Sequence, residues 1–338
     1  MASSPGQRAS RPGFQHWRTS APRLPRRVEP DSSGNALGTM APAPPSLLPH
    51  PTPTPAVDPP DDPKSLLLAA KALVFCGFPY QRNSLTTIVR EAHLGADTHL
   101  TVYLSTTEPN VPTPYGADRA LLAWITTLTY DTGFVTFTSL TDFFDAFRLA
   151  RSGVQYRRFE ERLHRLLSFS LSLILRTPGG VSRLNMRPLQ RAYTPRDGVE
   201  ARRLLAEETR SQLSLLPSDV KRYGILLDPA FLEYLRNNPV VLPLALMRRF
   251  HNRPLAWDAA SYLLYRCWSA RTPCVIPWKI VRRQLASVDQ LDRRLALSLN
   301  RVADEIRADY PDFPVRIEPG SHDLLVAPFR PPREHFRV

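Results

Sequence analysis

The sequence has very few cysteines, and none of them is spaced to form a metal site or a disulfide framework. Cys76, Cys267 and Cys274 are the three cysteines among 338 residues, and no Cys-x-x-Cys pair occurs. A cysteine-rich zinc site and a disulfide-stabilised secreted scaffold are therefore both excluded.

Long apolar runs are also missing. The longest candidate, residues 66–78, is shorter than the about 20 residues that a membrane-spanning helix needs, and Lys71 interrupts it. The N-terminus lacks the apolar core of a secretory signal. These absences predict a soluble protein that is located in the cytoplasm.

Catalytic motifs are absent as well. There is no Gly-x-x-x-x-Gly-Lys-Ser/Thr phosphate loop, since residues 179–183 lack its spacing and its lysine, and no Gly-x-Ser-x-Gly motif occurs. The His-x-His motif and tyrosine pair of a nicking enzyme are missing, and His93 and His99 are six residues apart without a carboxylate cluster. Asp142 and Asp145 are better explained by helix capping than by nuclease chemistry. We therefore expect a protein that is not an enzyme and that needs no metal or other cofactor.

Lysine is rare, although the chain is strongly basic. Lys+Arg total 44 against 31 Asp+Glu, the formal net charge is +13, and 40 of the 44 basic residues are arginine. A GC-rich genome also raises arginine content, but guanidinium groups suit phosphates and guanine edges. The net charge predicts a polyanionic partner, with nucleic acid favoured over an acidic membrane surface.

Proline is concentrated at the N-terminus. Residues 1–63 hold 15 of the 35 prolines, few aromatic residues and a net charge of +1, which predicts a disordered tail. Residues 64–198 and 199–338 each carry a net charge of +6. The basic surface is therefore expected on the parts that fold, and the length predicts two domains.

The first of these domains has a recognisable order of elements. Apolar spacing and turn residues predict a helix, a strand, two helices and a hairpin at 114–131, 134–137, 139–150, 154–167 and 169–186. A helix at 66–75 and strands at 84–90 and 99–105 precede them. Ser139 is the expected N-cap of its helix, and Leu128 is expected in the buried face of another. The order is that of a winged helix, a helix-turn-helix followed by a β-hairpin.

The second domain repeats this order. The pattern predicts a helix from Pro254, a strand at 274–276, helices at 278–285 and 287–309, and a hairpin of 315–318 with 323–327. A strand at 225–227 and helices at 228–237 and 244–250 precede them. Ser287 and Gln290 have the spacing of a capping box, and Leu291 is expected to face inward. We therefore predict an α+β, mostly helical fold with tandem winged-helix domains at 64–198 and 199–338.

Basic and amide side chains accompany the last helix of the first predicted helix-turn-helix. They are Arg151, Gln155, Arg157, Arg158, Arg162 and Arg165. Arg158, Arg162 and Arg165 are expected to share one face, opposite the apolar residues. Such a face predicts contacts to phosphates and base edges in a major groove. The alternative is a solvated face that Glu160 and Glu161 neutralise.

The second helix-turn-helix carries an equivalent set. It comprises Lys279, Arg282, Arg283, Gln290, Arg293, Arg294, Asn300 and Arg301. Gln290 is expected near a helix N-terminus, where the base-reading side chains of helix-turn-helix proteins are concentrated. Three acidic residues dilute this field, namely Asp289, Asp292 and Asp304. Double-stranded DNA remains the favoured partner over a solvated face.

A membrane surface is the remaining alternative for these helices. An arginine-rich amphipathic helix can lie on anionic lipid, and residues 154–167 have the required pattern. The apolar face of this helix is needed by the winged-helix core, however. No membrane contact is therefore expected.

Several segments resemble the RepA-type family of plasmid replication initiators in their order and spacing. They are Pro114-Tyr-Gly-Ala-Asp-Arg-Ala-Leu-Leu-Ala-Trp124, Ser139-Leu-Thr-Asp-Phe143, the arginine-rich helix 153–167, Leu227-Asp-Pro-Ala-Phe231, Asn238-Pro-Val-Val-Leu242, Arg253-Pro-Leu-Ala-Trp-Asp258, Tyr262-Leu-Leu-Tyr-Arg266, Ile276-Pro-Trp278, Tyr310-Pro311 and Leu324 to Pro328. The resemblance extends over about residues 70–330 and leaves out the N-terminal tail.

This resemblance implies a role in plasmid replication. It implies binding to repeated origin sites (iterons), opening of the duplex, and recruitment of the host replication initiator and helicase. It also implies a homodimer in equilibrium with a monomer, in which the dimer represses its own promoter as part of plasmid copy control. A winged-helix transcriptional regulator without a replication role is the alternative that the residues leave open.

Overall fold

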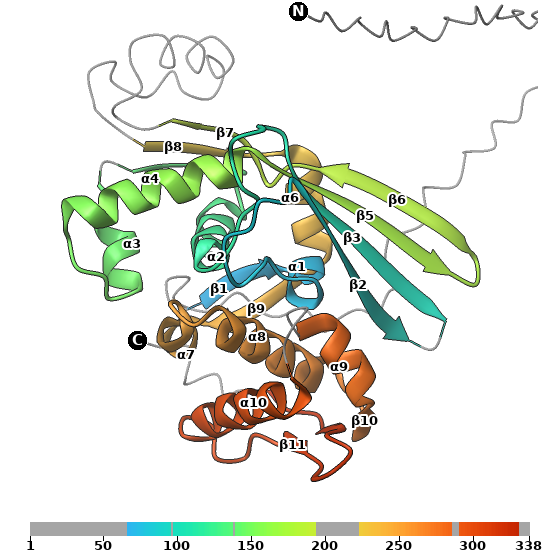
Figure 1. Cartoon of the computed structure of the whole chain (residues 1–338). Coiled ribbons are helices and arrows are strands. Elements are labelled where there is room, and N and C mark those ends of the chain that lie inside the picture. Colours follow the sequence, from blue (N-terminus) through green and yellow to red (C-terminus); the bar gives the residue numbers. More distant parts are fainter. Residues whose placement is uncertain (1–65, 96, 138, 194–222, 286–290, 331–338) are drawn as a thin grey trace, which may run out of the picture. The chain divides into compact units, whose positions relative to one another are not determined.

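The computed structural model describes residues 66–95, 97–137, 139–193, 223–285 and 291–330. The predicted disordered tail lies outside these ranges, and so do Ser287 and Gln290. The described ranges contain helices together with strands that pair into antiparallel sheets, which confirms the α+β prediction (Figure 1).

The first half of the chain contains the predicted series of helices and strands. The elements are β1 (Leu66–Ala70), α1 (Lys71–Phe75), β2 (Thr87–Gly95), β3 (Thr98–Thr106), α2 (Asp118–Thr129), β4 (Phe134–Phe137), α3 (Thr141–Ala146), α4 (Gly153–Leu167), β5 (Phe169–Thr177), β6 (Gly180–Met186) and β7 (Leu189–Tyr193). Gly133 has a φ of 76° between α2 and β4, a backbone conformation that favours glycine. From α2 to β6 the order is helix, strand, two helices and hairpin, as the sequence predicts.

Three local predictions in this half are wrong. The first five residues of the predicted helix 66–75 form β1 instead, because they pair with the apolar strand β9 (Pro239–Pro243). Ser139 is not the N-cap of α3: the cap position is Leu140, and the Ser139 hydroxyl accepts a hydrogen bond from the Thr141 N–H at 3.2 Å. Leu128 is 42% exposed and lies outside the buried face of α2.

The second half repeats the order. Its elements are β8 (Tyr223–Leu227), α6 (Pro229–Asn237), β9, α7 (Leu244–Met247), the 3-10 turn η2 (Arg248–Phe250), α8 (Pro254–Ser269), β10 (Cys274–Ile276), α9 (Trp278–Leu285), α10 (Asp292–Arg307), β11 (Arg316–Ile317) and β12 (Leu324–Val326). The Asp228 carboxylate caps α6 by accepting from the N–H groups of Ala230 and Phe231 at 2.9 and 3.2 Å. From α8 to β12 the chain again forms helix, strand, two helices and hairpin.

The two halves differ in how their strands pair. In the second half, the hairpin β11–β12 pairs with β10, the strand between the helices. In the first half, the hairpin β5–β6 joins β2 and β3 in a four-stranded sheet, while β4 pairs with β8. Two sheets therefore combine strands from both sides of residue 198, because β8 lies between β4 and β7 and β9 pairs with β1. The division into domains at 198/199 stays a prediction.

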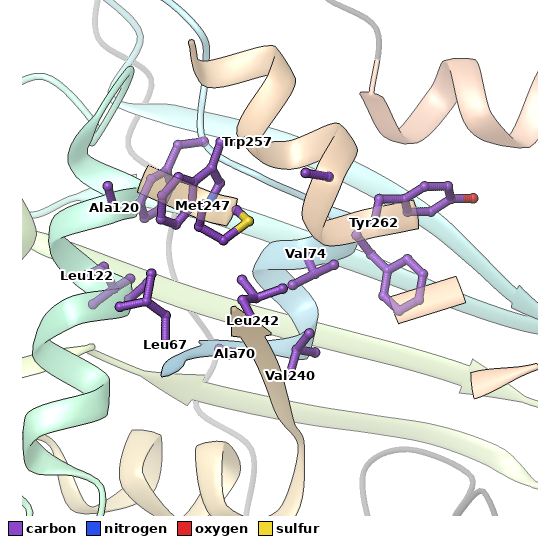
Figure 2. Packing of buried hydrophobic residues seen from close by; sticks show 14 of the residues in the cluster. Leu67, Ala70, Val74, Ala120, Leu122, Val240, Leu242, Met247, Trp257 and Tyr262 are labelled. Carbon is purple, nitrogen blue, oxygen red and sulfur yellow. The ribbon is translucent and has the colours of Figure 1, made fainter. Parts of the chain in front are cut away.

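A continuous apolar core connects the two halves. Leu67 of β1 and Leu122 of α2 are buried in the same cluster as Leu242 of β9 and Trp257 of α8 (Figure 2). Burial of one such side chain stabilises a fold by roughly 1.5–3 kcal/mol. This packing holds the first helix of each repeated unit, α2 and α8, in one core.

A buried ion pair also joins these two helices. The Arg119 Nε on α2 lies 2.8 Å from Asp258 Oδ1 on α8, and the side chains are 6% and 8% exposed. Arg119 also donates to the carbonyl oxygen of Phe78 at 2.6 Å. Burial raises the pKa of Asp258 to about 6, and the charge of Arg119 opposes this shift. A Cβ at Gly77 would lie 2.5 Å from Asp258 Oδ2, so only glycine fits against the pair.

Candidate nucleic-acid interface

The N-terminal half of α4 exposes two cations. The helix is capped by Ser152, whose hydroxyl accepts from the Gln155 N–H at 3.4 Å. Arg157 and Arg158 follow and are exposed, and neither forms an ion pair with any residue that the structure describes. Arg151, just before the helix, donates to both Asp145 oxygens at 2.8 and 2.9 Å. The two exposed arginines can therefore bind an anion without breaking an existing ion pair.

Arg162 and Arg165, one to two turns further along α4, are directed at a buried carboxylate on α2. Arg165 donates to both oxygens of Asp118 at 2.8 and 2.9 Å, and Arg162 Nε lies 3.7 Å from Oδ1. The Asp118 side chain is 1% exposed, and its charge requires a partner there. The guanidinium of Arg165 also lies 4.6 Å from the ring centre of Tyr115, and burial lowers the pKa of Arg162.

The three arginines of the expected stripe, Arg158, Arg162 and Arg165, differ in their exposure and in their partners. Arg158 faces solvent, whereas the other two are half-buried and bound to α2. The apolar side of the helix is as expected, with Phe159, Leu163 and Leu166 buried. A contact of Arg162 or Arg165 with DNA stays a prediction. Such a contact would compete with the ion pairs that these arginines form with Asp118.

The helix α9 links α10 to the four-stranded sheet. Its predicted cations are Lys279, Arg282 and Arg283, and all three are exposed. Arg282 Nε lies 2.8 Å from Asp292 Oδ1 at the start of α10. Arg283 Nη1 lies 2.7 Å from His93 Nε2 on β2, and its Nη2 lies 3.5 Å from Glu91 Oε2. Two of the three cations are thus engaged with neighbouring elements.

The helix α10 has the clearest division into two faces. Its buried face is apolar throughout and consists of Leu295, Ala296, Leu299, Val302, Ala303 and Ile306. Arg293, Arg294, Asn300 and Arg301 are exposed on the other side, together with Leu297 at 60% exposure. Among the described residues, none forms an ion pair with these three arginines. The face is therefore cationic and open.

The acidic residues of α10 do not neutralise this face. Asp292 is paired with Arg282, and Asp304 is paired with Arg307 at 2.5 Å. Both carboxylates thus have cations of their own, one on α9 and one in the last turn of α10. The third acidic residue of the set, Asp289, lies outside the described residues.

Two predictions at the start of this helix have different outcomes. The described helix begins at Asp292, and Leu291 is 63% exposed at its N-cap position, so the expected inward orientation of Leu291 is wrong. Gln290 and Ser287 lie outside the described residues. The base contact of Gln290 and its capping box with Ser287 stay predictions.

The partners of the cations could not be predicted from the sequence. Asp118 was expected only as part of a helix, and its role as the buried acceptor of Arg165 depends on how α2 and α4 pack. His93 and His99 are six residues apart in the sequence and are directly paired across β2 and β3. Gly95 and Asp97, turn-forming residues between the two histidines, are the sequence signal that could have shown this pairing.

The described residues show no metal-binding group and no membrane helix. In these ranges, no three His, Cys, Asp or Glu side chains are grouped so that they could hold a metal ion. No helix in them is both long enough and apolar enough to span a bilayer.

Comparisons with known proteins found similarity in solved structures alone. No family model matches the chain, and no curated protein matches it. A crystal structure of RctB domains 2-3 is 16% identical with a TM-score of 0.47, covering 76% of this chain and 87% of that one. A selenomethionine derivative of RctB domains 2 and 3 is 15% identical with a TM-score of 0.47, covering 72% and 85%. Similarities of this size do not determine a function, and the resemblance to RepA-type initiators stays a prediction.

Proposed function

We propose that this protein binds double-stranded DNA through two winged-helix units and initiates plasmid replication. The observation that carries the DNA-binding part is the open cationic face of α10. Arg293, Arg294 and Arg301 lie there without an ion-pair partner among the described residues, on the last helix of a helix-strand-helix-helix-hairpin unit. In helix-turn-helix proteins, this helix enters the major groove, where arginines contact phosphates and guanine edges.

The charge pattern supports this assignment over a merely solvated face. An arginine that is already paired must lose its carboxylate before it meets a phosphate, whereas an unpaired exposed arginine releases only counterions. The described part of α10 offers three unpaired arginines, and the start of α4 offers Arg157 and Arg158. Both repeated units therefore contribute cations to one polyanion, in agreement with the net charge of +13.

The initiator role goes beyond DNA binding and is supported by the ordered motifs of the RepA-type resemblance. In this proposal, the protein binds iterons, opens the origin, recruits the host initiator and helicase, and represses its own promoter as a homodimer in equilibrium with monomer. It does so without catalysis and without a metal or nucleotide cofactor.

The DNA-binding part is tested with the full-length protein and a random duplex library. Repeated selection should recover a defined site, and its affinity should fall by about 10³–10⁵ between 50 and 200 mM salt if 6–10 phosphates are contacted. A variant with Arg293→Gln and Arg294→Gln should bind more weakly and with a smaller salt dependence. A matched variant, Arg187→Gln with Arg271→Gln, changes two exposed arginines outside α4, α9 and α10 and should bind normally. Failure to select any site would refute the proposal.

The initiator role is tested in cells. The gene and the DNA that flanks it are placed on a circle without its own origin, and persistence of the circle is scored. Persistence that depends on the gene and on directly repeated copies of the selected site supports an initiator. Binding to the same site with repression of a promoter but no persistence identifies a transcriptional regulator instead.

A further inference from the structure

A cluster of titratable side chains lies where the β2–β3 hairpin meets α9. His93 on β2 and His99 on β3 are cross-strand neighbours, with ring centres 4.4 Å apart. Arg283 on α9 places Nη1 2.7 Å from His93 Nε2, and Gln284 Nε2 donates to the His93 carbonyl oxygen at 3.4 Å. Since a guanidinium only donates, this contact makes His93 Nε2 an acceptor, and the ring is neutral.

More positive charge than negative charge surrounds this histidine pair. On α9, Lys279 is exposed, and its charge and that of Arg283 both lower the pKa of His93. On β5, the exposed Arg176 is the register partner of His99 and donates to Thr101 Oγ1 at 3.1 Å. The acidic member is Glu91, which lies 3.5 Å from Arg283. Three cations and two histidines thus face one carboxylate.

The cluster is connected to the proposed DNA-binding helix. Arg282, next to Arg283 on α9, bridges to Asp292 in the first turn of α10. The exposed cations of α10 and the cluster at the sheet are therefore joined through the single short helix α9. In a helix-turn-helix, the helix that precedes the recognition helix crosses the DNA backbone.

We propose that His93, His99, Arg176, Lys279 and Arg283 form a site for a backbone phosphate of the same duplex that α10 contacts. This inference rests on the proposed function and extends the interface from α10 across α9 to the sheet. A phosphate fits the cluster because it accepts hydrogen bonds from guanidinium, ammonium and imidazolium groups together. In the described ranges no three His, Cys, Asp or Glu side chains are grouped so that they could hold a metal ion, so Glu91 and the two histidines do not form a metal site.

The site makes DNA binding depend on pH in a defined direction. Burial lowers the pKa of His93, and His99, Arg283 and Lys279 lower it further, while Glu91 opposes them. When a phosphate docks, Arg283 donates to it in place of His93 Nε2, so that Nε2 can take up a proton. The phosphate then stabilises the protonated ring and raises its pKa above that in the free protein. Binding then takes up a proton, so affinity rises as the pH falls through the range in which His93 titrates.

The test uses the full-length protein with its selected duplex and with a scrambled duplex of equal length. Affinities are measured from pH 6 to pH 8 and at several salt concentrations for His93→Gln with His99→Gln, and separately for Arg176→Gln. Loss of one phosphate contact should reduce the salt slope by about 0.9, which corresponds to about eightfold weaker binding at 0.1 M salt on both duplexes. The double variant should also lose most of the pH dependence. His164→Gln, an exposed histidine that pairs with Glu108, serves as the matched control and should keep it.

Glutamine at position 93 can still accept a hydrogen bond from Arg283, so the packing of α9 on β2 is preserved, and thermal unfolding checks this. Wild-type salt and pH dependence in both variants would overturn the inference while leaving the proposed function intact. So would weaker binding by the double variant alone, with Arg176→Gln normal and the pH dependence unchanged. If the wild-type protein binds neither duplex, the proposed function fails before this inference does.

Discussion

The two repeated units, α2 to β6 and α8 to β12, have the same order of elements but use their last helix differently. In α4, two arginines neutralise the buried Asp118 of the first helix of the unit, and only the N-terminal half keeps exposed cations. In α10, the buried face is entirely apolar, and the arginines stay on the open side. The same helical position thus serves mainly the fold in one unit and the surface in the other.

The hairpins of the two units differ in the same way. The hairpin β11–β12 pairs with β10, a strand of its own unit, whereas the hairpin β5–β6 pairs with β3 in a sheet with β2, outside its unit. The first unit therefore has a larger sheet, and the end of that sheet contacts α9 of the second unit through His93. The two units are therefore joined parts of one folded core, and their last helices have different roles.

The largest predicted effect concerns the ion pair that joins α2 and α8. Arg119→Leu removes the ion-pair partner of Asp258 and leaves its buried carboxylate without a salt bridge. We expect the free energy of unfolding to fall by about 3–5 kcal/mol, in one cooperative transition that includes both units. Urea denaturation followed by tryptophan fluorescence and circular dichroism measures it. Two separate transitions would show that the units fold independently, and a loss below about 1 kcal/mol would show that the ion pair contributes little to stability.

The next largest predicted effect concerns the arginines of α4, of which some bind Asp118 and others are exposed. Arg165→Ala removes two charge-assisted hydrogen bonds to Asp118, so we expect a loss of about 1.5–3 kcal/mol in unfolding free energy. Arg158→Ala changes an exposed side chain and should alter stability by less than about 0.5 kcal/mol while weakening DNA binding. Denaturation and fluorescence anisotropy on both variants separate the two roles. The reverse pattern would mean that Arg165 is the residue that faces DNA.

The smallest predicted effect concerns a substitution on the exposed face of α10. Leu297 is 60% exposed, so Leu297→Ala should change the unfolding free energy by less than about 0.5 kcal/mol. Leu299→Ala, two residues away and fully buried, is the matched control and should cost about 2–5 kcal/mol. Equal losses in thermal or urea denaturation would show that the exposed face of α10 is covered by another part of the protein.

Much of the local structure was predictable from the sequence, because it depends on nearby residues. Pro229 after Asp228 marks the start of α6, and the apolar spacing of α10 identifies its buried residues. Pairing between distant strands was not predictable. The residues of β1 fit a helix until Pro239–Pro243 supplies a strand partner more than 160 residues away.

The positions of the basic residues in the candidate site could be predicted from the sequence, but their contacts could not. The positions of the basic residues on α4, α9 and α10 follow from helical periodicity alone. Whether an arginine faces solvent or a buried acid depends on what lies across the helix, as Asp118 shows for Arg165. The histidine pair of β2 and β3 depends on a local hairpin register, whereas its contact with Arg283 of α9 depends on how the two halves pack, which is not a local property of the sequence.

In the proposed complex, each unit presents one helix to the same DNA duplex. Hydroxyl-radical footprinting of the full-length protein on its selected site tests this arrangement. We predict two protected regions about one helical turn apart, one lost in Arg157→Ala with Arg158→Ala and the other in Arg293→Ala with Arg294→Ala. A single protected region that only the α10 variant removes would contradict the claim and leave the second unit as the sole DNA-binding part.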